Sequence, residues 1–156
     1  MAINSRNLIY AASLLLSVMM VFGSCRRDDP EYIAKRDREK ILEYLEENEL
    51  DYLELESGVF VVIEEEGIGA HPSENSTVKL NYTGYLLNGN VFDSGEGASL
   101  YLPGTVQGFS IGIRQFRRSG EGKILIPSAL GYGSYARGSI PRNSVLIFDV
   151  KIIDFN

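Results

Sequence analysis

The sequence predicts an α+β domain in which several antiparallel strands are crossed by one short helix, with a helical extension in front. Two observations lead to this prediction. From residue 57 onward the apolar pattern changes to a period of two, as in strands with one buried face. Within residues 105–120 the apolar residues follow a helical spacing instead. Phe109, Ile113 and Phe116 are at positions i, i+4 and i+7, which lie on one face of a helix. About 100 residues suffice for one independent core, so we expect a single domain over residues 57–156.

Residues 1–24 are typical of a secretory signal peptide, because Arg6 precedes an uncharged apolar run that ends abruptly in charged residues. The only cysteine, Cys25, follows the sequence FGS at the end of this run. This arrangement resembles the lipobox of bacterial lipoproteins, in which the cysteine is lipidated and becomes the first residue. We therefore expect a lipidated linker over residues 25–30. An uncleaved membrane anchor with an incidental cysteine is the alternative, and both interpretations place the domain outside the cytoplasm at a membrane.

A helical extension is expected over residues 31–56. Within EYIAKRDREKILEYLEENEL (31–50), Ile41, Tyr44 and Leu45 have the i, i+3, i+4 spacing of an amphipathic helix, and charged residues occupy the other faces. The apolar stripe would dock either on the domain or on another copy of the protein.

Four later segments have the alternation and the β-branched or aromatic composition of strands. Because only one helical segment lies among them, they predict an antiparallel sheet crossed by that helix. The four segments span residues 58–67, 76–87, 122–128 and 144–155.

The segment NYTGYLLNGNVFDSG (81–95) predicts a hairpin in which Asn88-Gly89 forms a two-residue type I′ turn. In that register Leu87 faces Asn90, Tyr85 faces Phe92 and Gly84 faces Asp93. Tyr82 is then the diagonal neighbour of Asp93 on the same face, so its hydroxyl could donate a hydrogen bond to the carboxylate. The alternative is an Asx-turn, in which Asp93 bonds its own backbone where the strand ends.

A glycine-rich loop joins the last two predicted strands, with the sequence IPSALGYGSYARGSIPRNS (126–144). Loops of this length in compact domains are often functional, and this one carries Tyr132 and Tyr135. It lacks the Lys-Ser/Thr ending of a phosphate-binding loop and precedes no helix.

Composition excludes several classes of function. The formal net charge is -6 and no basic stripe is present, which argues against nucleic acid as a partner. One cysteine allows no internal disulfide, and one histidine leaves too little for a histidine-based metal site, so we expect no metal.

Four segments, in order and with matching spacing, resemble the signatures of FKBP-type peptidyl-prolyl cis-trans isomerases. They are VKLNYTGYLLNGNVFDSG, LYLPGTVQGFSIGIRQF, GKILIPSALGYG and IPRNSVLIFDVKIID, and the resemblance covers roughly Val59 to Phe155. It implies a strongly curved antiparallel sheet that wraps one short helix. It also implies acceleration of X-Pro bond rotation in proline-containing unfolded or extended polypeptides, without a cofactor, and binding of macrolide inhibitors.

The resemblance assigns Asp93 and Tyr132 to the catalytic positions of the pocket. At Phe109 the family usually has a tryptophan, which this chain lacks altogether. The short loop expected after Asp93, SGEGA, has no basic residue of the kind that often partners the aspartate. The substrate-binding positions implied are Tyr82, Phe92, Val106, Phe109, Ile140 and Phe148.

Together with the lipobox, the resemblance predicts a folding-assisting isomerase of the bacterial cell envelope. It would be lipid-anchored on the periplasmic side or at the outer-membrane surface. Two alternatives belong to other classes: a non-catalytic proline-binding or chaperone module, and an interaction domain whose helix at 31–50 mediates assembly.

Overall fold

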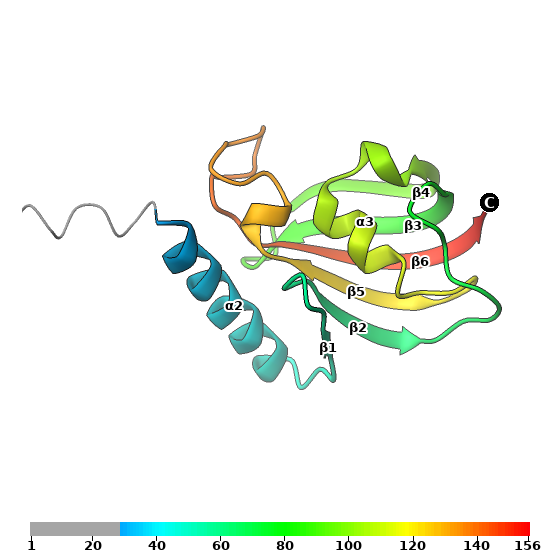
Figure 1. Cartoon of the computed structure of the whole chain (residues 1–156), viewed down its shortest axis with the longest axis horizontal. Helices are drawn as coiled ribbons and strands as arrows, with labels where there is room; N and C mark the ends of the chain where they lie inside the picture. The colour runs from blue at the N-terminus through cyan, green and yellow to red at the C-terminus, as the bar shows by residue number, and fades with distance from the viewer. Residues whose placement is uncertain (1–28) are drawn as a thin grey trace, which may run out of the picture. The chain divides into compact units, whose positions relative to one another are not determined.

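The computed structural model describes residues 29–156 of the chain (Figure 1). The predicted signal peptide, residues 1–24, and Cys25 lie outside the described residues. Residues 34–156 form one compact unit. Within the described range, no helix is both long enough and apolar enough to cross a membrane.

The core of this unit is one six-stranded sheet in which every neighbouring pair of strands is antiparallel. The strand order is β1-β2-β5-β6-β3-β4, so the long last strand lies in the middle of the sheet. The predicted α+β class with an antiparallel sheet is confirmed. The strands are β1 (Leu53–Glu54), β2 (Phe60–Glu65), β3 (Thr77–Leu86), β4 (Val91–Tyr101), β5 (Glu121–Ile126) and β6 (Leu146–Phe155).

A single short helix, α3 (Gln107–Ile113), lies across one face of the sheet (Figure 1). Two glycines allow the close approach: a Cβ at Gly108 would lie 2.2 Å from Ile126 Cγ2, and one at Gly112 would lie 2.3 Å from Ile124 Cγ2. The predicted helix of residues 105–120 is therefore present but shorter. Phe116 lies beyond its end in a tight turn and is nevertheless fully buried.

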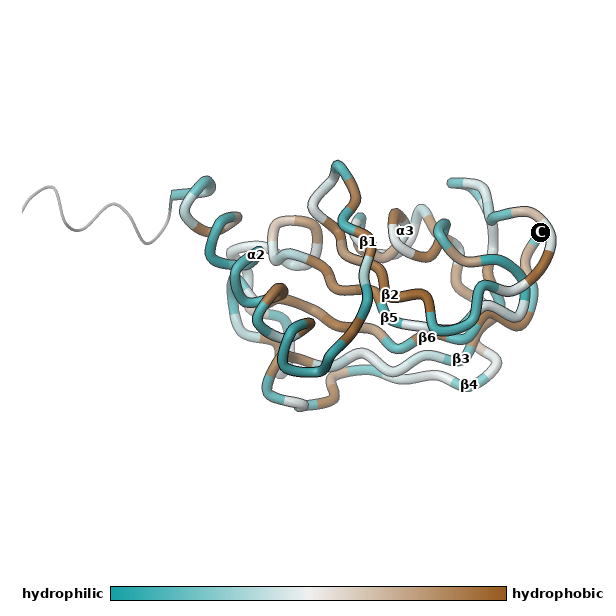
Figure 2. Tube along the Cα trace, turned by 90° about the horizontal axis from the view of Figure 1, so that it is seen from below, coloured by the Kyte–Doolittle hydropathy of each residue, from teal (hydrophilic) through white to brown (hydrophobic). Residues whose placement is uncertain are grey.

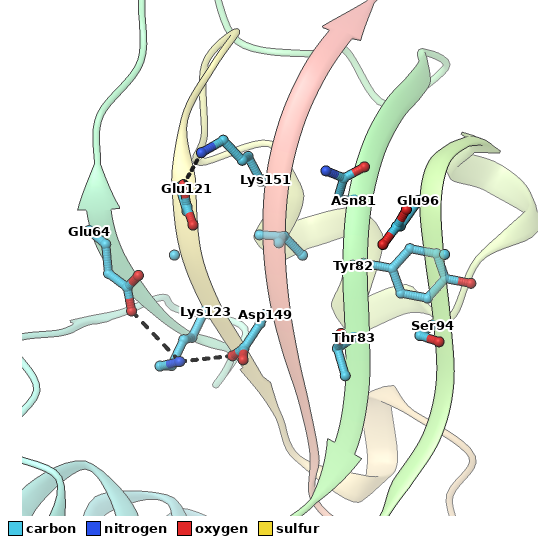
Figure 3. Close-up of a pocket in the computed structure, with 13 residues that line it drawn as sticks. Glu64, Asn81, Tyr82, Thr83, Ser94, Glu96, Glu121, Lys123, Asp149 and Lys151 are labelled. Carbon is cyan, nitrogen blue, oxygen red and sulfur yellow. Dashed lines mark hydrogen bonds and ion pairs between the residues drawn. The ribbon is translucent and has the colours of Figure 1, made fainter.

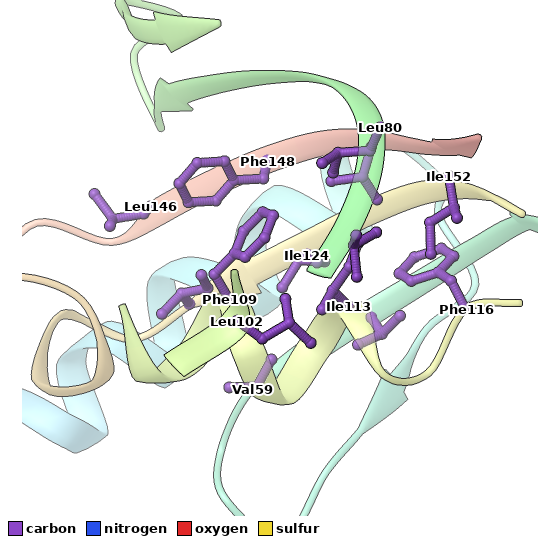
Figure 4. Packing of buried hydrophobic residues seen from close by; sticks show 14 of the residues in the cluster. Val59, Leu80, Leu102, Phe109, Ile113, Phe116, Ile124, Leu146, Phe148 and Ile152 are labelled. Carbon is purple, nitrogen blue, oxygen red and sulfur yellow. The ribbon is translucent and has the colours of Figure 1, made fainter. Parts of the chain in front are cut away.

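The main hydrophobic core fills the space between α3 and the sheet (Figure 4). Apolar residues run along β2, β5 and β6, which are the most hydrophobic strands in Figure 2. Alternate residues of these strands point to the α3 face, as the period of two requires. Among them are Ile124 of β5 and Leu146, Phe148 and Ile152 of β6; Val59, just before β2, and Leu80 of β3 join the same core.

The N-terminal helix α2 (Pro30–Glu47) packs its apolar stripe on the opposite face of the sheet. Ile41 and Leu45 are fully buried in a second cluster that includes Phe60, Leu125 and Ile147. Of the two uses foreseen for this stripe, docking on the domain is the one that the structure shows.

The hairpin turn differs from the prediction. Leu86 N–H donates to the Asn90 carbonyl across a three-residue loop, and Gly89 has a φ of +82° while Asn88 has no positive φ. The turn is therefore not type I′, which needs positive φ at both central residues. Tyr85 pairs with Val91 rather than with Phe92.

A β-bulge at Phe92 then restores the expected alignment, because one extra residue is inserted between the Tyr85–Val91 and Gly84–Asp93 pairs. The predicted Gly84–Asp93 pairing is correct for this reason. The short loop expected after Asp93 is absent from the structure, because β4 continues from Val91 to Tyr101.

Candidate functional site

A pocket of about 460 Å³ opens on the α3 face of the sheet, between the start of that helix, β3, β4, β6 and the loop after β5. Six of the eight residues singled out from the sequence line it. A smaller adjoining hollow of about 270 Å³ takes in the other two, Phe92 and Ile140, together with Asp93 and Tyr132. The six in the larger pocket are Tyr82, Asp93, Val106, Phe109, Tyr132 and Phe148.

Phe148 is the centre of the pocket's aromatic floor. Its ring meets Phe109 edge to face with centroids 5.0 Å apart, and Phe92 in the same manner at 5.5 Å. Gly84, on the neighbouring strand, lies under these rings. A Cβ there would lie 2.7 Å from Phe92 and 2.8 Å from Phe148, so a glycine is needed for the two rings to meet.

The polar rim contains the predicted hydrogen bond between Tyr82 and Asp93. The Tyr82 hydroxyl donates to Asp93 Oδ2 at 2.9 Å, while Asp93 Oδ1 accepts the Ser94 N–H at 3.0 Å. The predicted bond to Tyr82 is therefore confirmed. The Asx-turn is not, because Oδ1 accepts from the next residue rather than from two residues on, and β4 continues through Asp93. Burial, followed by the bond to Asp93, raises the pKa of Tyr82 to about 12, so this phenol remains a donor throughout the physiological range.

Tyr132 projects from the loop between β5 and β6 and lines both hollows. The guanidinium of Arg137 lies over its ring, with the Cζ atom 5.0 Å from the ring centroid. In the described part of the chain, the Tyr132 hydroxyl makes no hydrogen bond to another side chain or to the backbone, so it is available to a ligand.

Arg137 is the residue that sequence reasoning missed. It lines both hollows together with Asp93, and its guanidinium lies over the Tyr132 ring. A basic side chain thus borders the pocket although the segment SGEGA that follows Asp93 has none. The only sequence signal was a single arginine in the glycine-rich tip, SYARGS. A residue in an irregular loop belongs to no periodic pattern, so the direction of the Arg137 side chain could not be predicted from the sequence.

A larger hollow, about 680 Å³, is a shallow groove on the opposite face of the sheet (Figure 3). Most of its charged groups are paired: Lys123 contacts both Asp149, at 2.9 Å, and Glu64, at 3.7 Å, while Lys151 pairs with Glu121. The groove has no apolar floor of the kind that a proline ring would need. Across residues 29–156, no group of three or more potential ligand side chains is placed to hold a metal ion.

Comparisons with known proteins agree with this geometry. Residues 69–153 match the model of a family described as FKBP-type peptidyl-prolyl cis-trans isomerase. The FKBP-type isomerase FkpA of Aeromonas hydrophila is 39% identical over 102 residues, which are 63% of this chain and 38% of that protein. A probable FKBP-type isomerase of Haemophilus influenzae is 40% identical over 106 residues, 65% of this chain and 44% of that protein.

Among solved structures, the crystal structure of FkpA from Escherichia coli superimposes with a TM-score of 0.69 at 26% identity, covering 100% of this chain and 84% of that one. The chain spans less than half the length of these two curated relatives. The family model nevertheless covers more than half of the chain itself. The chain therefore belongs to the family of FKBP-type peptidyl-prolyl cis-trans isomerases.

Proposed function

We propose that this chain is a peptidyl-prolyl cis-trans isomerase that accelerates rotation about X-Pro bonds and so assists the folding of extracytoplasmic proteins. Family membership supports this proposal. The observation that carries it is one pocket in which an aromatic floor, Phe109 and Phe148, lies beside a polar rim of Tyr132 and the Tyr82–Asp93 pair.

The reaction needs no nucleophile and no proton transfer. A planar peptide bond is held by resonance, which places negative charge on the carbonyl oxygen and gives a rotation barrier of ~18–20 kcal/mol. The twisted amide has lost this charge separation and is less polar. An apolar pocket therefore binds the twisted amide more tightly than the planar ground state. Lowering the barrier by roughly 4–7 kcal/mol accelerates rotation about 10³- to 10⁵-fold.

In this mechanism the apolar residues receive the proline ring. Phe148 and Phe109 form the floor, Val106 forms the wall at the start of α3, and Phe92 and Ile140 border the adjoining hollow. Because Phe109 and Phe148 are nearly fully buried, the floor is already ordered before substrate arrives. A preformed floor reduces the entropy lost on binding.

The polar residues orient the substrate. Tyr132 would donate its hydroxyl to a substrate carbonyl. Asp93, held by Tyr82, would place a fixed dipole beside the rotating carbonyl without acting as a general base. Both roles are electrostatic positioning, which costs little reorganisation when the donors are held in advance.

The proposed partners are proline-containing unfolded or extended polypeptides, and macrolide inhibitors would compete for the same pocket. The proposed location is the cell envelope of a bacterium, with the chain held at the membrane by lipid on Cys25. The signal-like residues 1–24 and the cysteine that follows them support this location.

A protease-coupled isomerisation assay on a proline tetrapeptide tests the proposal. We expect catalysis that a macrolide such as rapamycin inhibits. The second candidate, a non-catalytic proline-binding module, is favoured by Phe109 in the place of the family's usual tryptophan. Binding of the tetrapeptide without any increase in the isomerisation rate would support that candidate and contradict the isomerase.

A further inference from the structure

The loop between β5 and β6 is held at its base by two residues of α2. Asp37 is buried, with 1% of its surface exposed. Its Oδ2 accepts the Ser128 N–H at 2.9 Å and the Ser128 hydroxyl at 2.5 Å. Its Oδ1 accepts a bond from Arg36 Nη2 at 2.7 Å. A buried carboxylate is costly unless it is paired and hydrogen-bonded, and these two partners meet that requirement.

These contacts belong to a closed ring of hydrogen bonds. Gly133 N–H donates to the Ser128 carbonyl at 2.8 Å, and Asn143 N–H donates to the Gly133 carbonyl at 2.7 Å. Arg36 Nη2 donates to the Asn143 carbonyl at 3.1 Å, which closes the ring through Asp37. Both ends of the loop are thus joined to each other and to α2. We call these five residues the α2–loop ring.

The α2–loop ring is directly connected to the pocket through the chain. Tyr132 immediately precedes Gly133, and Ile140 lies between Gly133 and Asn143. Both residues line the candidate site. A shift of the ring would therefore move the proposed hydrogen-bond donor and an apolar contact together.

Helix α2 is itself fixed, so it can serve as a rigid support. Ile41 and Leu45 are buried against the sheet. The Tyr44 hydroxyl lies 3.3 Å from that of Tyr85, which donates to Asp149 at 2.8 Å. These contacts lie on the face of the sheet opposite the pocket, so α2 reaches the loop while it is anchored to the far side of the domain.

We propose that Asp37 and Arg36 are positioning residues for the pocket, and that α2 is part of the catalytic unit rather than a spacer between anchor and domain. Through the α2–loop ring, Asp37 and Arg36 would hold Tyr132 and Ile140 in their places in the pocket. This inference rests on the proposed isomerase function, since it assigns α2 a part in that activity.

The test compares substitutions in the whole chain. Asp37→Ala removes the acceptor for Ser128, whereas Asp37→Asn keeps one oxygen that can still accept both Ser128 bonds, but its amide nitrogen cannot accept from Arg36, so it opens the ring at Arg36 alone. Arg38→Ala is the matched control, because Arg38 follows on the same helix and makes an exposed pair with Glu54. Ser128→Ala removes only the bond from the Ser128 hydroxyl to Asp37. This milder variant replaces Asp37→Ala in the test if Asp37→Ala does not fold.

We expect Asp37→Ala to lower kcat/KM on a proline tetrapeptide roughly tenfold to a hundredfold, as misplacement of a binding group by about 1 Å can do. The loss should appear mainly as a higher KM. Loss of folded protein alone would lower kcat per mole of chain and leave KM unchanged. Asp37→Asn should recover the part of the loss that depends on the Ser128 bonds but not the part that depends on Arg36, and Arg38→Ala should match the wild type.

Amide hydrogen exchange gives a readout that does not depend on activity. Exchange at Gly133 and Asn143 should accelerate in Asp37→Ala, or to a lesser degree in Ser128→Ala, while the amides of β5 and β6 stay protected. A folded Asp37→Ala protein with wild-type KM and unchanged exchange at these two amides would overturn the inference. An inactive wild-type chain would instead refute the proposed function, and the exchange measurement would still decide whether Asp37 holds the loop.

Discussion

The ring of Phe109 meets the ring of Phe148 edge to face, with centroids 5.0 Å apart and planes inclined by 72°. Phe109 comes from α3 and Phe148 from the central strand β6, so this contact joins the helix to the sheet directly beneath the pocket (Figure 4). Aromatic pairs in this geometry contribute about 0.5–1.5 kcal/mol beyond the area that they bury. The floor of the candidate site is therefore also part of the core.

Phe109→Trp should tighten the binding of rapamycin. The indole has more apolar surface and an N–H that phenylalanine lacks, and the 460 Å³ pocket above Phe109 has room for the larger ring. The dissociation constant, measured by calorimetry, should decrease, while Tyr101→Trp, which alters an exposed tyrosine, should leave it unchanged. Weaker binding by the Phe109→Trp protein would mean that the indole overpacks the core against Phe148.

Arg137→Ala should raise KM for a proline tetrapeptide severalfold. The guanidinium lies over the Tyr132 ring, and an exposed contact of this kind contributes about 0.5–1 kcal/mol to holding the ring in place. Tyr135→Phe is the control, since Tyr135 is on the same loop but is 78% exposed. Unchanged kinetics for Arg137→Ala would show that Tyr132 is held without the cation.

The Tyr82 phenol should ionise well above the ordinary tyrosine value. Its pKa is raised from 10.0 to about 12. The folded chain therefore favours the neutral phenol more strongly than the unfolded chain does, and this preference adds to the free energy of unfolding. That contribution is fully present below about pH 10 and is lost as the pH rises through about 12. Ultraviolet titration of the wild type minus Tyr82→Phe should isolate one phenol with a midpoint near 12. A midpoint near 10 would contradict the burial and hydrogen bonding described for this residue.

Processing at Cys25 can be tested separately from the domain. Because an uncharged signal-like run ends at the chain's only cysteine, we expect cleavage before Cys25 and attachment of one diacylglyceryl group to its sulfur. Mass spectrometry of the mature protein should find no peptide from residues 1–24. A Cys25→Ser protein that is normally processed and fully membrane-bound would refute the lipid anchor.

Most of the fold could be predicted because β2, β3, β5 and β6 each have a local pattern of their own. The short β1 (Leu53–Glu54) instead lies inside the predicted helical extension of residues 31–56, whose helix ends at Glu47. The hairpin illustrates the limit: the turn was assigned two residues instead of three, and the bulge at Phe92 was not foreseen. The two errors cancel at Gly84 and Asp93. The Tyr82–Asp93 bond was therefore predicted correctly from an incorrect register.

The parts of the site that escaped prediction depend on contacts between distant segments. Asp37 and Ser128 are 91 positions apart, and Asp37 appeared in the sequence as one charge among many on a solvated helix face. Arg137 lies in an irregular loop, where side-chain direction follows from backbone turns rather than from a period. Neither residue belongs to a repeating pattern, so only the three-dimensional arrangement reveals its partners.

The central claim is that catalysis depends mainly on an apolar pocket that favours the twisted amide, with hydrogen bonds in a lesser role. It is tested by kcat/KM for Tyr132→Phe, Asp93→Leu and Phe148→Ala on one proline tetrapeptide, with folding verified by circular dichroism. Tyr132→Phe should cost one hydrogen bond, about 0.5–1.5 kcal/mol. Phe148→Ala should lower kcat/KM the most, because it opens the apolar floor to water, and Asp93→Leu should lie between. The cavity left by Phe148→Ala also lowers the free energy of unfolding, by about 3–5 kcal/mol where the ring is buried, which is why folding must be verified. If Tyr132→Phe or Asp93→Leu abolishes activity while a folded Phe148→Ala retains it, polar chemistry dominates and the apolar-pocket mechanism is wrong.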